Sequence, residues 1–179
     1  MFKKILIVLG VALVAFVIVA ALQPADYKVV RTATISAPPA AVFAQVNDLH
    51  KWQAWSPWEK LDPAMKRTFE GPAAGVGASY AWDGNKDVGA GRMTITEAKP
   101  DERITMKLEF FKPMEGVNTT VFAFTPEGKG TTVTWSMEGK KNFVSKAVCL
   151  FMNMDKMVGG QFEEGLANLQ RVVATPTAK

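Results

Sequence analysis

The pattern of hydrophobic and polar positions divides the chain at residue 22. Residues 5–22 form an apolar run that only Gly10 interrupts, and Lys3 and Lys4 precede it. As a helix this run would measure about 27 Å, at ~1.5 Å per residue, close to the ~30 Å hydrocarbon core of a bilayer. The pattern predicts a transmembrane signal-anchor helix over residues 5–22, with residues 1–4 as a short tip outside the membrane.

The main alternative for this run is a cleaved signal peptide, whose apolar stretch is usually about 7–15 residues long. The run here is longer, although Val-Ala-Ala at 19–21 resembles a cleavage site. Because Lys3 and Lys4 precede the run, the positive-inside bias predicts a cytoplasmic N-terminus and an extracytoplasmic domain. Residues 23–27 follow the run as a linker.

Beyond the linker, short segments with strand character alternate with turn residues. Residues 28–36 are rich in Val, Thr and Ile, and residues 40–47 carry apolar side chains at helical spacing behind Pro38 and Pro39. Apolar and polar residues alternate most clearly in the later segments, which indicates strands with one buried face. The turn chemistry between them predicts an antiparallel sheet. The six further strand candidates are 65–70, 78–82, 91–98, 103–111, 117–125 and 131–138.

The periodicity changes from strand to helix near the C-terminus. Apolar residues recur at helical spacing between residues 142 and 174, which predicts one long helix over the apolar face of the sheet. Gly159 and Gly160 should loosen or kink it, since each glycine costs about 1 kcal/mol relative to alanine. The predicted fold class is therefore α+β, with one domain over residues 28–174 and a flexible tail at 175–179.

Composition excludes several classes of function. The single cysteine and single histidine rule out a disulfide framework and a Cys-based zinc site, so we expect no metal and no cofactor. The net charge is +4, which falls to +2 without Lys3 and Lys4, and no basic run of five or more occurs. Nucleic acid is therefore not an expected partner.

Several strings resemble a known family in their order along the chain. These are Arg-Thr-Ala-Thr-Ile-Ser-Ala-Pro-Pro at 31–39, Trp-Gln-Ala-Trp-Ser-Pro-Trp at 52–58, and Phe-Glu-Glu-Gly-Leu at 162–166. Together they resemble the SRPBCC superfamily, which includes START lipid-transfer and pollen-allergen-like proteins, and within it the bacterial polyketide cyclase/dehydrase and lipid transport group. For a bacterial member, the predicted extracytoplasmic side is the periplasmic side of the inner membrane.

The resemblance implies a helix-grip fold, in which a curved antiparallel sheet of about seven strands surrounds the long C-terminal helix and leaves an elongated cavity. Nine Met and five Trp would give such a cavity an adaptable wall. Plain core packing explains the same side chains equally well. We predict that ligand-binding residues line this cavity, with Trp55 and Trp58 at its mouth and, further in, Tyr80, Trp82, Met106, Phe110, Trp135, Met137, Phe151 and Met154.

Three functions are compatible with this sequence, because the superfamily's scaffold hosts carriers, enzymes and modules without activity. The preferred hypothesis is a membrane-tethered module that binds a hydrophobic small molecule or lipid and has no catalytic residues. The first alternative is a cyclase- or dehydratase-like enzyme, with Tyr80 or Glu97 as the polar partner of a bound ketone. A buried Glu97 would favour it. The second is a ligand-free interaction domain at the membrane surface, which a filled interior would favour.

Overall fold

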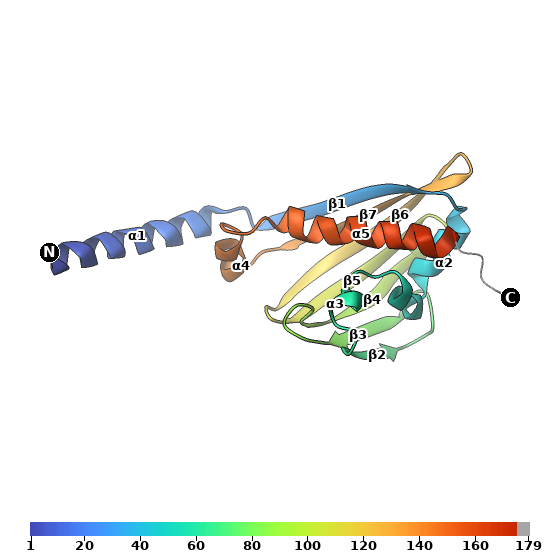
Figure 1. Ribbon diagram of the computed structural model, residues 1–179, viewed down its shortest axis with the longest axis horizontal. Helices are drawn as coiled ribbons and strands as arrows, with labels where there is room; N and C mark the ends of the chain where they lie inside the picture. The colour runs from blue at the N-terminus through green and yellow to red at the C-terminus, as the bar shows by residue number, and fades with distance from the viewer. Residues whose placement is uncertain (175–179) are drawn as a thin grey trace.

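The computed structural model describes residues 1–174 and shows a projecting N-terminal helix at one end of a curved sheet (Figure 1). Helix α1 (Phe2–Leu22) projects away from the rest of the chain, and Ala20 is its only buried residue. It is long and apolar enough to cross a membrane. Strand β1 (Asp26–Ile35) starts after a three-residue connection. The tail predicted at 175–179 lies outside the described residues.

The sheet confirms the predicted α+β fold class. Its seven strands lie in the order β1-β7-β6-β5-β4-β3-β2, and every neighbouring pair is antiparallel. The first and last strands pair, so β1 and β2 are the two edges, as in a helix-grip fold. The strands after β1 are β2 (Lys66–Glu70), β3 (Ser79–Asp83), β4 (Ala90–Lys99), β5 (Arg103–Lys112), β6 (Gly116–Glu127) and β7 (Gly130–Lys140).

Three short helices carry the chain from β1 to β2 at the opposite edge of the sheet. Helix α2 (Pro39–Asn47) begins at the proline pair, because proline has the φ of a first helical turn and lacks only an N–H that would be unpaired there. A 3₁₀ turn, η1 (Leu49–Ala54), and helix α3 (Trp58–Leu61) follow. The Trp-rich stretch therefore forms short helical turns.

The C-terminal region forms two helices, so the prediction of one continuous helix over 142–174 was wrong. Helix α4 (Phe143–Val148) and helix α5 (Met154–Ala174) are separated by residues 149–153. Asparagine caps both starts. Asn142 Oδ1 accepts a hydrogen bond from Ser145 N at 2.8 Å, and Asn153 Oδ1 accepts one from Lys156 N at 2.9 Å. These side chains satisfy backbone N–H groups that an uninterrupted helix would use internally.

The glycines of α5 bring the helix close to the sheet and do not interrupt it. A Cβ at Gly159 would overlap the guanidinium of Arg31, and a Cβ at Gly165 would lie 2.7 Å from Cζ3 of Trp135. By contrast, a Cβ at Gly160 would meet nothing within 4 Å. Helix α5 runs from Met154 to Ala174 without a break at Gly159–Gly160, and Gly159 and Gly165 serve close packing.

The core lies between the concave face of the sheet and α5. Alternate residues of each strand point inward, as the period of two requires. On β7, Val133, Trp135 and Met137 are buried, while the residues between them are less so. Helix α5 contributes Phe162, Leu166 and Leu169 from the opposite side.

Candidate functional site

An aromatic cluster centred on Trp135 joins the sheet to α5. The Trp135 ring stacks on Phe162 of α5, with ring centroids 4.1 Å apart and planes 7° apart. Phe122 and Trp55 also pack against Trp135, at centroid distances of 4.6 and 5.8 Å. The sheet and helix therefore meet at this point, and the expectation of open space between Trp135 and the C-terminal helix was wrong.

Two tryptophans from the 52–58 string enter this cluster in different ways. Trp55 is only 1% exposed, and its Nε1 donates to the Gln45 carbonyl at 3.3 Å. It belongs to the core, so its predicted place at a cavity mouth was wrong; the turn after η1 directs it inward. Trp58 is half-buried, and its ring meets the edges of Trp135 and Phe162. Trp52, which the prediction omitted, is buried beside Trp55.

Two buried polar atoms on the inward face have no hydrogen-bond partner. They are Nε1 of Trp135 on β7 and Oγ1 of Thr120 on β6, among the residues that the structure describes. The two residues are 2% and 3% exposed. Thr120 lies opposite Met106 on β5 and Met137 on β7, which are both buried. Protein interiors nearly always pair their polar groups. Each of these two atoms therefore has unused hydrogen-bonding capacity within an apolar surface.

Sequence reasoning missed Thr120, although a signal was available. Thr120 lies two residues before Phe122 and four before Phe124, so it shares their inward face. A threonine in that position places a hydroxyl among apolar side chains. Met106 and Met137 are the cross-strand neighbours of Thr120 and were predicted, as was Trp135 on the next strand. A ligand-binding role for these three residues stays a prediction.

The far side of the concave face carries two half-buried aromatic rings. Trp82 on β3 and Phe110 on β5 meet edge to face, with centroids 6.0 Å apart. The indole Nε1 of Trp82 donates to the Val88 carbonyl at 3.2 Å. These predicted residues keep partial exposure, unlike Trp135, and so offer apolar surface that other side chains have not fully covered.

The Tyr80 hydroxyl takes part in a hydrogen-bonded cluster with an ion pair. Its hydroxyl donates to Glu59 Oε1 at 2.9 Å, and Arg67 Nη2 binds Glu59 Oε2 at 2.6 Å. Burial raises the pKa of the Tyr80 phenol, and the adjacent Glu59 carboxylate adds to that rise. Tyr80 therefore stays protonated and ties α3 to the sheet. The prediction identified Tyr80 but missed Glu59 and Arg67, because nothing in their spacing pairs them.

Glu97 lies on the exposed side of β4, after a register shift between Ile95 and Glu97. Its side chain is 41% exposed. Thr105 Oγ1 donates to Glu97 Oε2 at 3.0 Å, and this hydrogen bond lowers the pKa of the carboxyl group, with a smaller contribution from Lys99. Glu97 is therefore an ionised, solvated carboxylate, which counts against it as a catalytic acid.

A groove of about 500 Å³ opens at the end of the domain where α1 attaches. It lies between residues 27–29 of β1 and residues 149–155, with Lys141 at its edge. Phe151 lines this groove and is 81% exposed, so its predicted place in the internal cavity was wrong; the break between α4 and α5 turns it outward. Met154 is half-buried in the same groove.

A second groove of about 670 Å³ adjoins the first along the ends of β1, β7 and β6. Tyr27 and Lys28 line both grooves. The second also reaches Asn118, which is buried and lies two residues from Thr120 on the same strand face. Neither groove could be predicted from the sequence, because each is bounded by segments that lie far apart along the chain.

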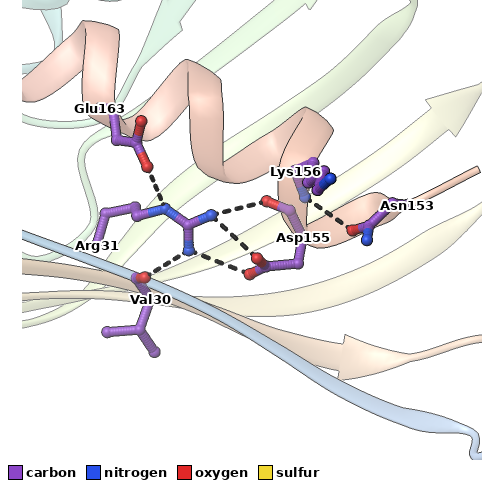
Figure 2. Close-up of polar contacts among 6 residues, drawn as sticks. All are labelled: Val30, Arg31, Asn153, Asp155, Lys156 and Glu163. Carbon is purple, nitrogen blue, oxygen red and sulfur yellow. Dashed lines mark hydrogen bonds and ion pairs between the residues drawn. The ribbon is translucent and has the colours of Figure 1, made fainter.

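Arg31 fastens the start of α5 to β1 (Figure 2). Its guanidinium binds the Asp155 carboxylate through two hydrogen bonds of 3.0 and 3.1 Å, and its Nε donates to Glu163 Oε1 at 2.6 Å. It also donates to the backbone carbonyls of Val30 and Asp155. Because Gly159 has no side chain, the Arg31 guanidinium fits closely against α5. Its contact with Asp155 fixes one wall of the first groove.

This contact predicts a pH-dependent effect of Asp155→Asn. The hydrogen bond from Arg31 lowers the pKa of the Asp155 carboxyl group. A lowered folded-state pKa stabilises the fold above the unfolded value of about 3.9, and this contribution is lost as the pH falls through the folded value. Asp155→Asn should therefore lower Tm at pH 7, and the difference from wild type should shrink at about pH 3. Calorimetry of the full chain in detergent measures both.

The matched control is Asp87→Asn, because the one ion pair of Asp87 within residues 1–174 is with the highly exposed Lys86. Its Tm should equal that of wild type at both pH values. A Tm difference for Asp155→Asn that is as large at pH 3 as at pH 7 would show that its charge is not what stabilises the contact.

Comparisons with known proteins agree with this architecture. The family described as polyketide cyclase / dehydrase and lipid transport matches residues 26–174. No curated protein matches the chain. Among solved structures, protein CV1439 from Chromobacterium violaceum is 17% identical with a TM-score of 0.61, and covers 83% of this chain and 97% of its own.

Two further solved structures share the fold. Protein Mll3558 from Rhizobium loti is 18% identical with a TM-score of 0.62, over 82% of this chain and 96% of its own. The Aha1 dimer from Colwellia psychrerythraea is 13% identical with a TM-score of 0.60, over 85% of this chain and 99% of its own. At these identities the likeness concerns the fold alone.

Proposed function

The chain belongs to the polyketide cyclase/dehydrase and lipid transport family, and from this we propose that it is a membrane-tethered module that binds a hydrophobic small molecule or lipid. The guest would lie against the concave face of the sheet, on the side of Trp82 and Phe110, where the rings keep some exposure. The Phe162 ring stacks on Trp135 and covers it. The family is consistent with such a ligand.

The observation that carries this proposal is that two of the buried polar atoms without a hydrogen-bond partner in residues 1–174, Trp135 Nε1 and Thr120 Oγ1, belong to inward-facing residues of neighbouring strands. An indole N–H donates only, whereas a hydroxyl both donates and accepts. An oxygen of the guest, such as a carbonyl or hydroxyl, would accept from Trp135 Nε1 or pair with Thr120 Oγ1. The surrounding Met106 and Met137 would contact its hydrocarbon part.

The energetic scale suits an acyl or polycyclic guest. Burial of about ten methylene groups at ~0.8 kcal/mol each gives ~8 kcal/mol before ordering costs. A net free energy of about −8 kcal/mol corresponds to a micromolar Kd, so apolar contact alone sets micromolar affinity as the upper limit, and ordering costs weaken it. One or two hydrogen bonds would then orient the guest.

The proposed tether is α1, which has the length and composition of a single membrane span. Lys3 and Lys4 precede it and support a cytoplasmic N-terminus, with the domain on the extracytoplasmic side. The sheet domain begins only a few residues after the span, so the grooves at its α1 end would lie next to the bilayer.

The two alternatives receive unequal support. The enzyme hypothesis loses its two candidate groups, because Tyr80 is engaged with Glu59 and Glu97 is solvated. The interaction-domain hypothesis gains from the Trp135–Phe162 stack, which fills the space beneath the middle of α5. Ligand retention therefore discriminates between the preferred function and an interaction domain.

To test the proposed function, the full chain is extracted in detergent and its intact mass is measured by native mass spectrometry. We expect a retained small molecule, and we expect the delipidated protein to bind a dansyl-labelled fatty acid. Thr120→Val should weaken this probe's binding while raising Tm, because it removes a buried hydroxyl that has no partner in the free protein.

Thr125→Val is the matched control, because Thr125 is exposed on the opposite face of the same strand and lines neither groove. It should leave the affinity for the probe unchanged. A protein that emerges empty and does not bind the probe would overturn the proposed function and favour the interaction domain. Unchanged probe affinity in Thr120→Val would remove Thr120 from the site.

A further inference from the structure

A second apolar surface lies outside the core, on α4 and the residues after it. Its five side chains are between 38% and 81% exposed, and together we name them the α4 patch: Phe143, Val144, Val148, Phe151 and Met152. Scattered apolar residues are normal on a protein surface, whereas a contiguous group marks a contact with a partner or a membrane. Met114 of the β5–β6 connection lies beside the patch, within 3.9 Å of Ser145 Oγ.

The patch lies beside the end of α1 that leads into the domain (Figure 1). The Phe151 ring stacks on Phe16 of α1, with centroids 6.1 Å apart and an interplanar angle of 25°. Lys146 Nζ donates to the carbonyl of Ala21 at 3.2 Å. Two separate contacts therefore fix α4 against the last two turns of the apolar helix.

These contacts set the depth of the patch relative to the span. Phe16 precedes the end of α1 at Leu22 by six residues, which is about 9 Å along a helix. With α1 across the bilayer, Phe151 lies at the same depth as Phe16, about 9 Å below the level of Leu22. Interfacial segments bury their apolar faces by ~5–10 Å, so this depth is that of a segment lying in the bilayer surface.

The charges around the patch fit the same placement. Lys146 lies at the level of Ala21, next to the end of the span, where a long ammonium side chain can reach the headgroups. Lys140 and Lys141 lie at the same end of the domain and are adjacent to the grooves. Asp26 and Glu138 lie among these lysines, so the charge argument rests on Lys146, whose ammonium group can contact anionic headgroups beside the end of the span.

We propose that the α4 patch is embedded in the bilayer leaflet on the domain's side, so that the groove between residues 27–29 and 149–155 opens onto lipid. This rests on the proposed function and deepens it, because the guest would then enter from the membrane and not from water. The bilayer is favoured over a protein partner because Phe151 lies alongside a residue within the span itself, where acyl chains surround α1.

The chain's single cysteine provides a probe, since Cys149 lies in the break beside the patch and is partly exposed. The full chain is labelled there with bimane and reconstituted into vesicles of phosphatidylcholine and phosphatidylglycerol. We expect severalfold stronger quenching by a nitroxide near the top of the acyl chain than by aqueous iodide. Phe151→Glu should shift the probe toward iodide quenching, whereas Phe151→Leu should not.

Two further single-cysteine variants, both with Cys149→Ser, separate the possible failures. Leu13→Cys, in the middle of α1, should be quenched by a nitroxide deep in the acyl chain. Lys129→Cys, in the β6–β7 turn at the far end of β7 from α4, should be quenched only from water. If Leu13→Cys fails to report lipid, the tether itself is wrong. If Leu13→Cys reports lipid but the probe on Cys149 reports water, the tether stands and the embedded patch is wrong. The same conclusion follows if a second copy of the chain protects the probe on Cys149 from both quenchers.

Discussion

Trp135→Ala is expected to lower the free energy of unfolding by about 3–5 kcal/mol, the usual range for removing a large aromatic side chain from a core. Trp135 is 2% exposed and contacts rings from three separate parts of the chain, including Phe162, Phe122 and Trp55. Because α5 covers this ring directly, its removal leaves a cavity between the helix and the sheet. Urea denaturation of the full chain in detergent, followed by circular dichroism, measures the loss.

Lys107→Ala is the control for this prediction. Lys107 lies on the outer face of β5, about half exposed, and its only described ion pair is with Glu109 on the same strand. Exposed ion pairs contribute roughly 0–1 kcal/mol, so the variant should unfold close to wild type. Equal destabilisation by the two variants would mean that the inner and outer faces of the sheet are wrongly assigned.

The sheet could be predicted from the sequence because each strand signals its own buried face. Alternation at 104–110 and 133–137 reports which side chains turn inward, and that information is local. Pro38 and Pro39 likewise mark a helix start by their own backbone geometry. The family resemblance then implied a curved sheet around the C-terminal helix. The pairing of β1 with β7 was not predicted, because it joins distant segments and no local pattern contains it.

The site could be predicted only in part, because it depends on contacts between distant segments. Trp55 and Trp58 look equivalent in the sequence, yet one is core and the other half-buried. Phe151 fits the helical spacing of 142–174, but Asn153 caps a new helix and leaves it outside. Asparagine before a helical run is a readable capping signal, whereas the stacking of Phe151 on Phe16 is not.

Gly165→Ala is expected to destabilise the protein by about 1–3 kcal/mol, the typical cost of overpacking a well-filled core. Its Cβ would lie 2.7 Å from Trp135 Cζ3 and 3.3 Å from Pro57 Cδ. Neither neighbour can move easily, because the Trp135 ring is held by its own stack and Pro57 precedes α3 in a fixed turn. Thermal unfolding of the full chain in detergent measures the change.

Gly160→Ala on the same helix should have the opposite sign. Its Cβ would meet nothing within 4 Å, so the usual helix preference for alanine over glycine, about 1 kcal/mol, should appear as a gain in stability. Secondary-structure propensity is the same at both positions, so the difference between the two variants isolates the contact of α5 with the sheet. If Gly165→Ala is also stabilising, α5 does not lie tightly on Trp135, and the concave face beneath the middle of the helix has room for a guest.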